Sequence, residues 1–174
     1  TRDVAERFNS RFGETFVLPE AVIPKAAARV MDLQNPTDKM SKSAESDTGT
    51  ILLGDDLSHT VKKIRRAVTD SDDDVRWDPS GKPGVSNLLG ILGACTGRDP
   101  QVVADQYQQY GPLKSDTADA VVALLEPIRT RLADLRADPA ETTRLLTRGA
   151  EKAREIAVPV LDRALANVGL QPRS

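Results

Sequence analysis

The sequence has 174 residues and a formal net charge of −2; 39% of its residues are hydrophobic and 29% are charged. This length fits one ordinary domain or two small units, and the composition excludes a collagen-like or wholly disordered chain. The longest apolar stretches are only a few residues long, so the sequence offers no membrane span. The single Cys95 cannot form an internal disulfide and His59 is the only other soft ligand, which predicts no metal site and a reducing, cytoplasmic setting.

The charges are spread unevenly along the chain. Lys and Arg against Asp and Glu number seven against six in residues 1–43, six against nine in 44–84, and eleven against eleven in 85–174. No segment is strongly basic, so net charge does not predict a nucleic-acid partner. Any such binding must come from a local basic patch.

The start of the chain has a helical pattern. Apolar residues recur there at four-residue spacing: Val4, Phe8 and Phe12. This spacing predicts a helix over Thr1–Phe12 that ends at Gly13. Because the chain begins with threonine and the helix begins almost at once, we expect the sequence to be a piece of a longer chain.

Short extended segments are expected next. They are Phe16–Leu18 and Ala28–Leu33, and Pro19 and Pro24 would break any helix between them. After a polar loop, Ile51–Leu53 is expected to be a short buried strand or a turn of helix.

A basic helix is predicted from about Asp56 to Val68. Its exposed face carries Lys62, Lys63, Arg65 and Arg66. A solvated basic surface is the ordinary interpretation, and phosphate contact by Lys62 and Lys63 is the alternative.

A linker separates this helix from the rest of the chain. It contains the acidic run Asp70–Asp74 and then Pro79, Gly81 and Pro83, residues typical of solvent-facing turns. We therefore place the main internal boundary here, ending at Gly84.

The remainder of the chain is predicted to be helical. The expected helices are Val85–Cys95, ended by Gly97; Pro100–Tyr110; Ser115–Ala137; and Pro139 to about Val168. Asp99-Pro100 and Asp138-Pro139 pair a capping residue with a first-turn proline, and Gly111-Pro112 is expected to separate two helices. Pro127 and Pro159 are expected to kink or interrupt their helices.

The most specific chemical signal is the run Lys39-Met40-Ser41-Lys42-Ser43 in the polar loop Asn35–Thr50. Two lysines three positions apart, with hydroxyls between them, suit a polyphosphate. Fixed cations stabilise the negative charge that grows on a departing pyrophosphate. A solvated loop is the ordinary alternative for a generic mixture of lysine and serine. This exact order of five residues, however, rarely occurs by chance.

This run resembles the signature loop of the class I aminoacyl-tRNA synthetases. The wider sequence resembles the bacterial tryptophanyl-tRNA synthetase family, in the runs Thr1–Asn9, Ile23–Lys25, Ala28–Leu33, Pro36-Thr37 and Lys82–Leu89. The tyrosyl-tRNA synthetases share the general plan. The context of the loop and the run Lys-Pro-Gly-Val-Ser-Asn favour the tryptophan family.

The resemblance implies a mainly α fold with a small α/β part. Residues 1–55 would be the C-terminal remnant of a Rossmann-like catalytic domain, 56–84 a connecting helix and linker, and 85–174 a helical anticodon-binding domain. It also implies that an N-terminal half, which carries the remaining catalytic signature and the tryptophan-binding acid, is missing.

The implied activity converts tryptophan and ATP, supplied with Mg²⁺, to tryptophanyl-AMP and transfers the amino acid to tRNA(Trp). By resemblance, Lys39 and Lys42 hold the triphosphate and stabilise leaving pyrophosphate, and Ser41 and Ser43 contact it. The adenine side would be lined by Met40 and Val30, although Val30 is equally compatible with a buried strand residue. The complete enzyme would be a cytoplasmic homodimer. The alternative is a tRNA-binding module without chemistry.

Weaker candidates for tRNA contact are aromatic. Tyr107 and Tyr110 lie three positions apart among glutamines and would offer stacking to anticodon bases, with packing on a helix face as the alternative. We expect Trp77 to pack at the domain junction and His59 to be a surface residue. The acidic run Asp72–Asp74 is expected to be solvated.

Overall fold

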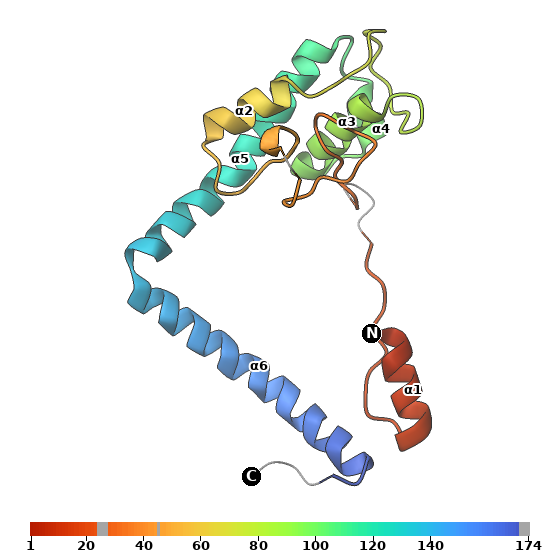
Figure 1. The fold of residues 1–174 in the computed structure, drawn as a ribbon, viewed down its shortest axis with the longest axis vertical. Helices are drawn as coiled ribbons and strands as arrows, with labels where there is room; N and C mark the ends of the chain where they lie inside the picture. The colour runs from red at the N-terminus through yellow and green to blue at the C-terminus, as the bar shows by residue number, and fades with distance from the viewer. Residues whose placement is uncertain (24–27, 45, 171–174) are drawn as a thin grey trace. The chain divides into compact units, whose positions relative to one another are not determined.

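The computed structural model describes residues 1–23, 28–44 and 46–170. Its helical elements in chain order (Figure 1) are α1 (Arg2–Phe12), the 3-10 turn η1 (Asp47–Gly49), α2 (Leu57–Arg65), α3 (Pro83–Thr96), α4 (Pro100–Ala104), α5 (Tyr110–Ala137) and α6 (Pro139–Asn167). The β pairing within these residues is an isolated antiparallel bridge between Met31 and Lys39. The predicted mainly α fold is confirmed.

The predicted extended segments differ from the structure. Phe16–Leu18 and the described residues of Ala28–Leu33 form no strand of a sheet, although Met31 takes part in the isolated bridge. Pro24, expected to lie between them, is outside the described residues. Leu52 and Leu53 are 38% and 57% exposed, so the prediction of a buried segment is wrong for them, whereas Ile51 is partly buried and packs against the core. Residues 51–53 form neither a strand nor a turn of helix.

Local capping signals place several helix ends as predicted. The carboxylates of Asp56, Asp99 and Asp138 accept hydrogen bonds from backbone N–H groups two or three residues ahead, at 2.7, 2.8 and 2.9 Å. Gly97 ends α3 with a left-handed φ of 69°, a conformation that glycine adopts without steric cost.

Other helix boundaries depend on contacts distant in sequence. Helix α2 ends at Arg65 rather than Val68, and the Val68 N–H instead donates to the carbonyl oxygen of Leu33 at 2.8 Å. Helix α4 ends at Ala104, well before the predicted end at Tyr110.

Prolines interrupt less than expected. Gly111-Pro112 lies inside the first turn of α5 instead of separating two helices, and neither Pro127 nor Pro159 interrupts its helix. A proline in the first turn lacks an N–H that would have no helical partner in any case.

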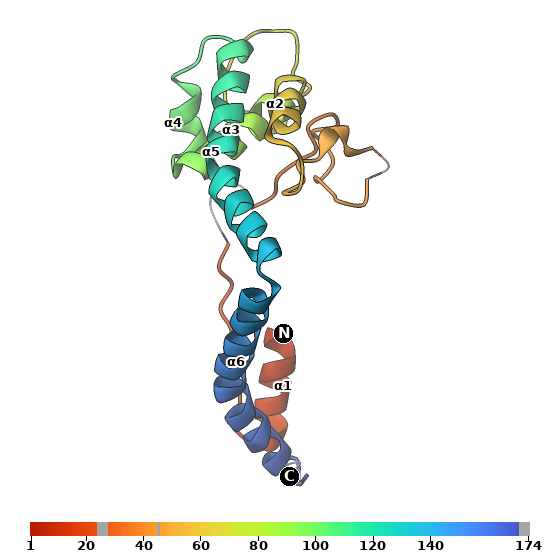
Figure 2. The same ribbon diagram turned by 90° about the vertical axis from the view of Figure 1, so that its left-hand side faces the viewer.

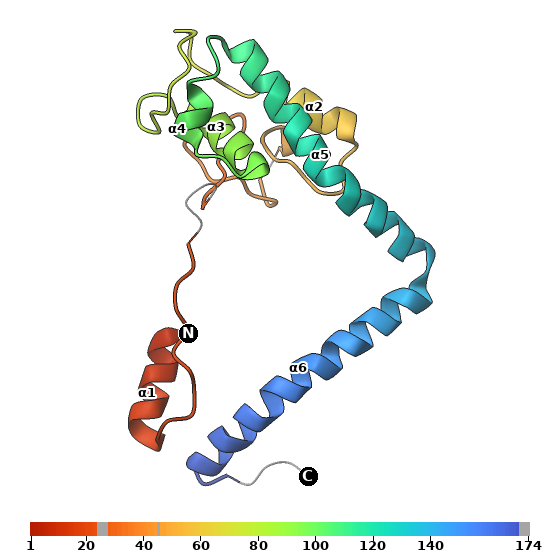
Figure 3. The same ribbon diagram turned by 180° about the vertical axis from the view of Figure 1, so that it is seen from behind.

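Two compact units divide the chain. One contains residues 23–133 and the other residues 1–22 and 134–174. In the first unit, α3 and α4 are neighbours (Figures 2 and 3). Its core gathers fully buried side chains from separate elements: Leu33, Ile64, Val85, Leu88, Leu89, Val103 and Leu113.

In the second unit, the segment after α1 is hydrogen-bonded both to α1 and to the end of α6. The Asn9 side chain accepts hydrogen bonds from the N–H groups of Thr15 and Phe16, and the Phe8 and Phe16 rings lie 4.9 Å apart. Asn167, the last residue of α6, donates to the Thr15 hydroxyl at 2.6 Å. These bonds attach the segment after α1 to the end of α6.

None of the helices in the described residues is long and apolar enough to cross a membrane. Nor do those residues contain a group of three or more His, Cys, Asp or Glu side chains arranged to hold a metal ion.

Candidate functional site

The run Lys39–Ser43 forms an exposed loop between the Met31–Lys39 bridge and η1. Lys39, Lys42 and the two serines are exposed, whereas Met40 is partly buried and packs against the core. The loop therefore presents its ammonium and hydroxyl groups to solvent and uses Met40 as an apolar anchor.

The start of the loop is fixed to the extended segment before it. The Met40 N–H donates to the Val30 carbonyl oxygen at 3.0 Å, and the Asp32 N–H donates to the Asp38 carbonyl oxygen at 2.8 Å. These two bonds pair the loop with Val30–Asp32 across a tight turn. The predicted adenine-side residues, Val30 and Met40, are thereby joined through their backbones.

The far side of the loop is fixed by hydroxyl groups. Thr50 donates its side-chain hydroxyl to the Ser41 carbonyl oxygen at 3.1 Å, and the Ser43 N–H donates to the Ser41 hydroxyl oxygen at 3.2 Å. Ser41 thus shapes the loop in addition to exposing its hydroxyl.

A close approach between Asp32 and Gly49 closes the base of the loop. The Asp32 carboxylate accepts hydrogen bonds from the N–H groups of Gln34 and Asn35 at 2.8 and 2.9 Å. A Cβ on Gly49 would overlap this carboxylate. A side chain at position 49 would therefore force the Asp32 carboxylate to move. The Gly49 carbonyl oxygen also accepts a hydrogen bond from the Leu33 N–H at 2.9 Å.

A hollow of about 340 Å³ lies beside the loop, and Lys39 and Ser41 line it together with η1 residues. Lys42 and Ser43 belong to the same loop but do not line this hollow. A cation and a hydroxyl beside an open hollow suit a phosphate group. The carboxylates of Asp32 and Asp38 also line it.

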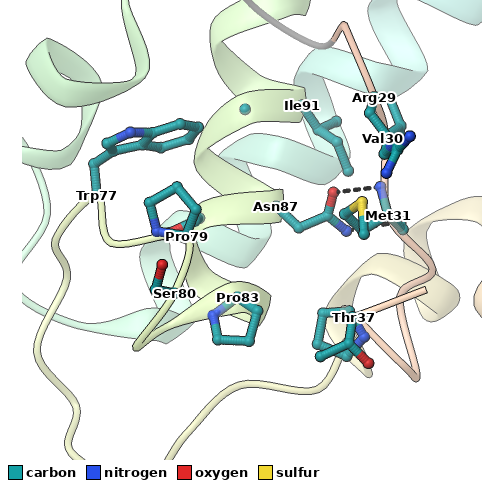
Figure 4. A pocket seen from close by; sticks show the side chains of 13 residues that line it. Arg29, Val30, Met31, Thr37, Trp77, Pro79, Ser80, Pro83, Asn87 and Ile91 are labelled. Atoms are coloured by element: carbon teal, nitrogen blue, oxygen red, sulfur yellow. Dashed lines mark hydrogen bonds between the residues drawn. The ribbon is translucent and has the colours of Figure 1, made fainter. Parts of the chain in front are cut away.

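A second cavity, of about 430 Å³, lies on the α3 side of the segment Arg29–Met31 (Figure 4). Trp77 lines it, is partly buried and packs against the core of the unit formed by residues 23–133. Asn87 reaches from α3 to the backbone of Met31 at its edge (Figure 4).

Comparison with known families adds to this geometry. The profile of the family described as "tRNA synthetases class I (W and Y)" matches residues 1–126. The chain belongs to this family.

Among the class I synthetases, the curated relatives similar to this chain are tryptophan–tRNA ligases. The chain is 50% identical to the tryptophan–tRNA ligase of Mycobacterium leprae over 174 residues, covering 99% of the chain and 51% of that protein. Its identity to tryptophan–tRNA ligase 1 of Streptomyces coelicolor is also 50%, over 98% of the chain and 51% of the relative. The resemblance to tryptophanyl-tRNA synthetases is confirmed, and the chain spans about half the length of these relatives.

Solved structures give the same result. Tryptophanyl-tRNA synthetase from Mycoplasma pneumoniae matches with a TM-score of 0.86 and 32% identity, over 97% of the chain and 51% of that structure. The enzyme from Campylobacter jejuni, complexed with ADP and tryptophan, matches with a TM-score of 0.59 and 27% identity, over 97% and 52%.

The neighbouring lysines of α2, which the sequence analysis treated together, have different surroundings. Lys62 is exposed, but the Lys63 ammonium donates to Asp55 at 2.8 Å, to Asp47 at 3.2 Å and to the Thr50 carbonyl oxygen at 2.9 Å. Burial opposes the charge of Lys63, but the hydrogen bonds to both carboxylates raise its pKa. Lys63 therefore attaches α2 to η1, and its placement on a solvated face is corrected.

A hollow of about 460 Å³ runs along α2. It is lined by His59, Lys62 and Lys63 of α2 and by Arg66, the residue that follows α2, which lie at spacings of three and four. Asp47 also lines it. Gln34 and Thr48 line both this hollow and the one beside Lys39. His59 is exposed, as expected.

The two tyrosines have different surroundings. The Tyr107 hydroxyl donates to Asp116 at 2.8 Å, and burial together with this carboxylate raises the pKa of Tyr107 to about 12. Tyr110 is only 8% exposed, and its hydroxyl contacts Asp70 and Lys82. A ring this buried has little surface on which a base could stack.

Lys82 and the acidic run form a cluster that sequence reasoning missed. The Lys82 ammonium donates to Asp70 at 2.8 Å, to Asp72 at 3.2 Å and to the Tyr110 hydroxyl at 3.1 Å. The interpretation of Asp70–Asp74 as a solvated linker is therefore corrected for Asp70, because a buried lysine requires charged partners. Lys82 immediately precedes α3 and is only 1% exposed, and no local pattern signals this.

Proposed function

We propose that the full-length protein containing this chain is a tryptophan–tRNA ligase, and that the chain forms its C-terminal portion. The full-length protein activates tryptophan with ATP, supplied as the magnesium complex, and forms tryptophanyl-AMP and pyrophosphate. It then transfers the amino acid to tRNA(Trp). The observation that carries the proposal is the anchored loop Lys39–Ser43 in a chain 50% identical to named tryptophan–tRNA ligases.

In this proposal Lys39 and Lys42 are the catalytic cations. As tryptophan's carboxylate attacks the α-phosphorus, the bond to pyrophosphate breaks and negative charge accumulates on the departing group. Cations fixed at that position stabilise the transition state more than the ground state. Ser41 and Ser43 donate hydrogen bonds to the same phosphates.

The adenine side is assigned to Val30 and Met40. Both are partly buried beside the core, and their backbones are already hydrogen-bonded to each other. A nucleotide bound there would place its phosphates toward Lys39 and Ser41, which line the adjoining hollow.

Binding of tRNA is assigned to the helical parts of the chain. Residues 85–174 form the anticodon-binding domain in this proposal, residues 1–55 belong to the Rossmann-like catalytic domain, and residues 56–84 connect them. The exposed Lys62, which lines the hollow along α2, is the favoured phosphate contact, and Tyr107 remains a candidate for contact with a base.

The tryptophan site is assigned to the part of the full-length protein that lies outside this chain. The complete enzyme is proposed to be a cytoplasmic homodimer. Sedimentation of the full-length protein tests the dimer, since a monomer at micromolar concentration would contradict it.

Tryptophan-dependent exchange of pyrophosphate into ATP by the purified full-length protein tests the activity. We expect exchange with tryptophan and none with tyrosine, followed by charging of tRNA(Trp). A protein that binds tRNA but shows no exchange with either amino acid would instead be the non-catalytic tRNA-binding module. Exchange with tyrosine alone would contradict the assigned substrate.

A further inference from the structure

The carboxamide of Asn87, on α3, lies against the backbone of Met31 (Figure 4). The Met31 N–H donates to Asn87 Oδ1 at 2.9 Å, and Asn87 Nδ2 donates to the Met31 carbonyl oxygen at 2.8 Å. The Asn87 residue is 8% exposed. Both polar functions of one side chain are thus committed to a residue 56 positions earlier.

This pairing imitates a strand. In an extended segment the N–H and C=O of one residue point to the same side, and a neighbouring strand satisfies both. A carboxamide carries one acceptor and one donor in a plane, so Asn87 takes the place of a strand at this edge. On the opposite edge, Val30 and Asp32 pair with the loop through the Met40 N–H and the Asp38 carbonyl oxygen.

Segment Val30–Asp32 is therefore held between α3 and the loop. Helix α3 is a rigid support, because Leu88 and Leu89, directly after Asn87, are 0% exposed. Side chains on rigid elements position a site more accurately than side chains on loops.

We propose that Asn87 is a positioning residue for nucleotide activation: it sets the location of segment Val30–Asp32 and, through it, of Lys39 and Ser41. This inference rests on the proposed function. Displacing a cation from a developing charge by about 1 Å costs up to ~100-fold in rate, so a loop attached to a shifted segment would lose activity without losing its lysines.

The test is Asn87→Asp in the full-length protein. The aspartate has the same shape and keeps the acceptor for the Met31 N–H, but it replaces the donor with an oxygen that faces the Met31 carbonyl oxygen. We expect kcat of tryptophan-dependent pyrophosphate exchange to fall ~10- to 100-fold and KM for ATP to rise. The dissociation constant for tryptophan should not change, because that site lies elsewhere.

The matched control is Ser86→Ala. Ser86 precedes Asn87 on α3, is 4% exposed and accepts a hydrogen bond from the Asp78 N–H at 3.0 Å, with no bond to Met31. It reports general damage to α3. Equal losses of kcat in Ser86→Ala and Asn87→Asp would overturn the positioning role.

Protonation provides a second readout. A protonated carboxyl regains a donor toward the Met31 carbonyl oxygen, so the activity of Asn87→Asp relative to the parent should recover as the pH falls. Activity is compared per folded molecule at each pH, because protonation also removes the cost of burying the carboxylate charge. A constant ratio per folded molecule would count against the proposal.

Asn87→Ala keeps the test open if the aspartate variant does not fold, because alanine buries no charge. In this variant, hydrogen exchange of the Met40 and Asp32 amides should accelerate while the α3 amides are unchanged. Unchanged exchange at Met40 and Asp32 would overturn the proposal. A parent protein without exchange activity would instead refute the proposed function, whereas an active parent with fully active Asn87 variants would refute only the role of Asn87.

Discussion

The ammonium group of Lys82 lies 2.8 Å from Oδ1 of Asp70, and the Lys82 side chain is only 1% exposed. Burial opposes ionisation of Asp70, but hydrogen bonds from Lys82 and from the Tyr110 hydroxyl outweigh it and lower the pKa of Asp70 to about 2. The ion pair connects the segment after α2 to the first residue of α5 through Tyr110. Its two charges lie 12 positions apart in a stretch that composition alone marks as a linker.

This ion pair predicts acid sensitivity. Because the pKa of Asp70 is lower in the folded chain than its ordinary value of 3.8, protonation favours the unfolded chain. The stabilisation is fully present above about pH 5 and is lost progressively as the pH falls toward 2. Urea unfolding of the 174-residue chain, followed by Trp77 fluorescence, should show this decline. In Asp70→Asn the free energy of unfolding should be lower at pH 7 and should depend less on pH between 5 and 2; an unchanged pH slope would contradict the role of the pair.

Replacing either loop lysine should impair chemistry more than binding. In the full-length protein, Lys39→Ala or Lys42→Ala should lower the rate of adenylate formation ~100-fold or more, equivalent to roughly 3 kcal/mol for a contact made mainly in the transition state. Pre-steady-state kinetics with tryptophan and ATP would measure this. An unchanged rate with weaker tryptophan binding would sink the assignment. The stability of both variants should match that of the parent, because both side chains are exposed.

The 174-residue chain by itself should not catalyse pyrophosphate exchange. In the proposed function its loop would neutralise the leaving group but would hold no attacking carboxylate in line, and positioning accounts for roughly 7–11 kcal/mol of such a barrier. The assay needs ATP, magnesium and tryptophan, together with circular dichroism to verify folding. Robust exchange by the folded chain would show that the site is complete within these residues.

Neighbouring lysines of α2 should behave differently. In the full-length protein, Lys62→Gln should weaken tRNA binding and reduce its logarithmic salt dependence by about 1, while leaving the melting temperature unchanged. Lys63→Gln should lower the melting temperature, because Asp55 and Asp47 lose their shared cation. Filter binding over a range of KCl concentrations distinguishes them, and tRNA affinity that ignores Lys62→Gln would exclude this residue from the contact.

Gly84→Ala should destabilise the contact between α3 and the segment after α2. A Cβ at Gly84 would overlap the Val68 carbonyl oxygen, and such overpacking typically costs ~1–3 kcal/mol. The matched control is Gly111→Ala, where a Cβ meets nothing within 4 Å. Chemical denaturation should show a loss only for Gly84→Ala, and equal midpoints for the two variants would mean that the close approach is relaxed without cost.

The sequence by itself determined the features that depend on a few consecutive residues. The caps at Asp56, Asp99 and Asp138 and the stop at Gly97 follow from local hydrogen bonds and backbone sterics. The loop Lys39–Ser43 was also recognisable, because its chemistry is carried by adjacent residues.

Only the tertiary structure decided the roles of residues whose partners are distant in sequence. Lys63 and Lys82 are of a residue type usually found on the surface. Their ammonium groups form ion pairs within the fold because folding brings carboxylates to them. Asn87 lies inside the predicted helix Val85–Cys95, but nothing in that pattern indicates its bonds to Met31, which exist only because α3 packs beside that residue. Tyr110 was predicted to end one helix and instead begins another. Burial and long-range pairing set these outcomes, since the free energy of a buried polar group depends on neighbours that no local pattern names.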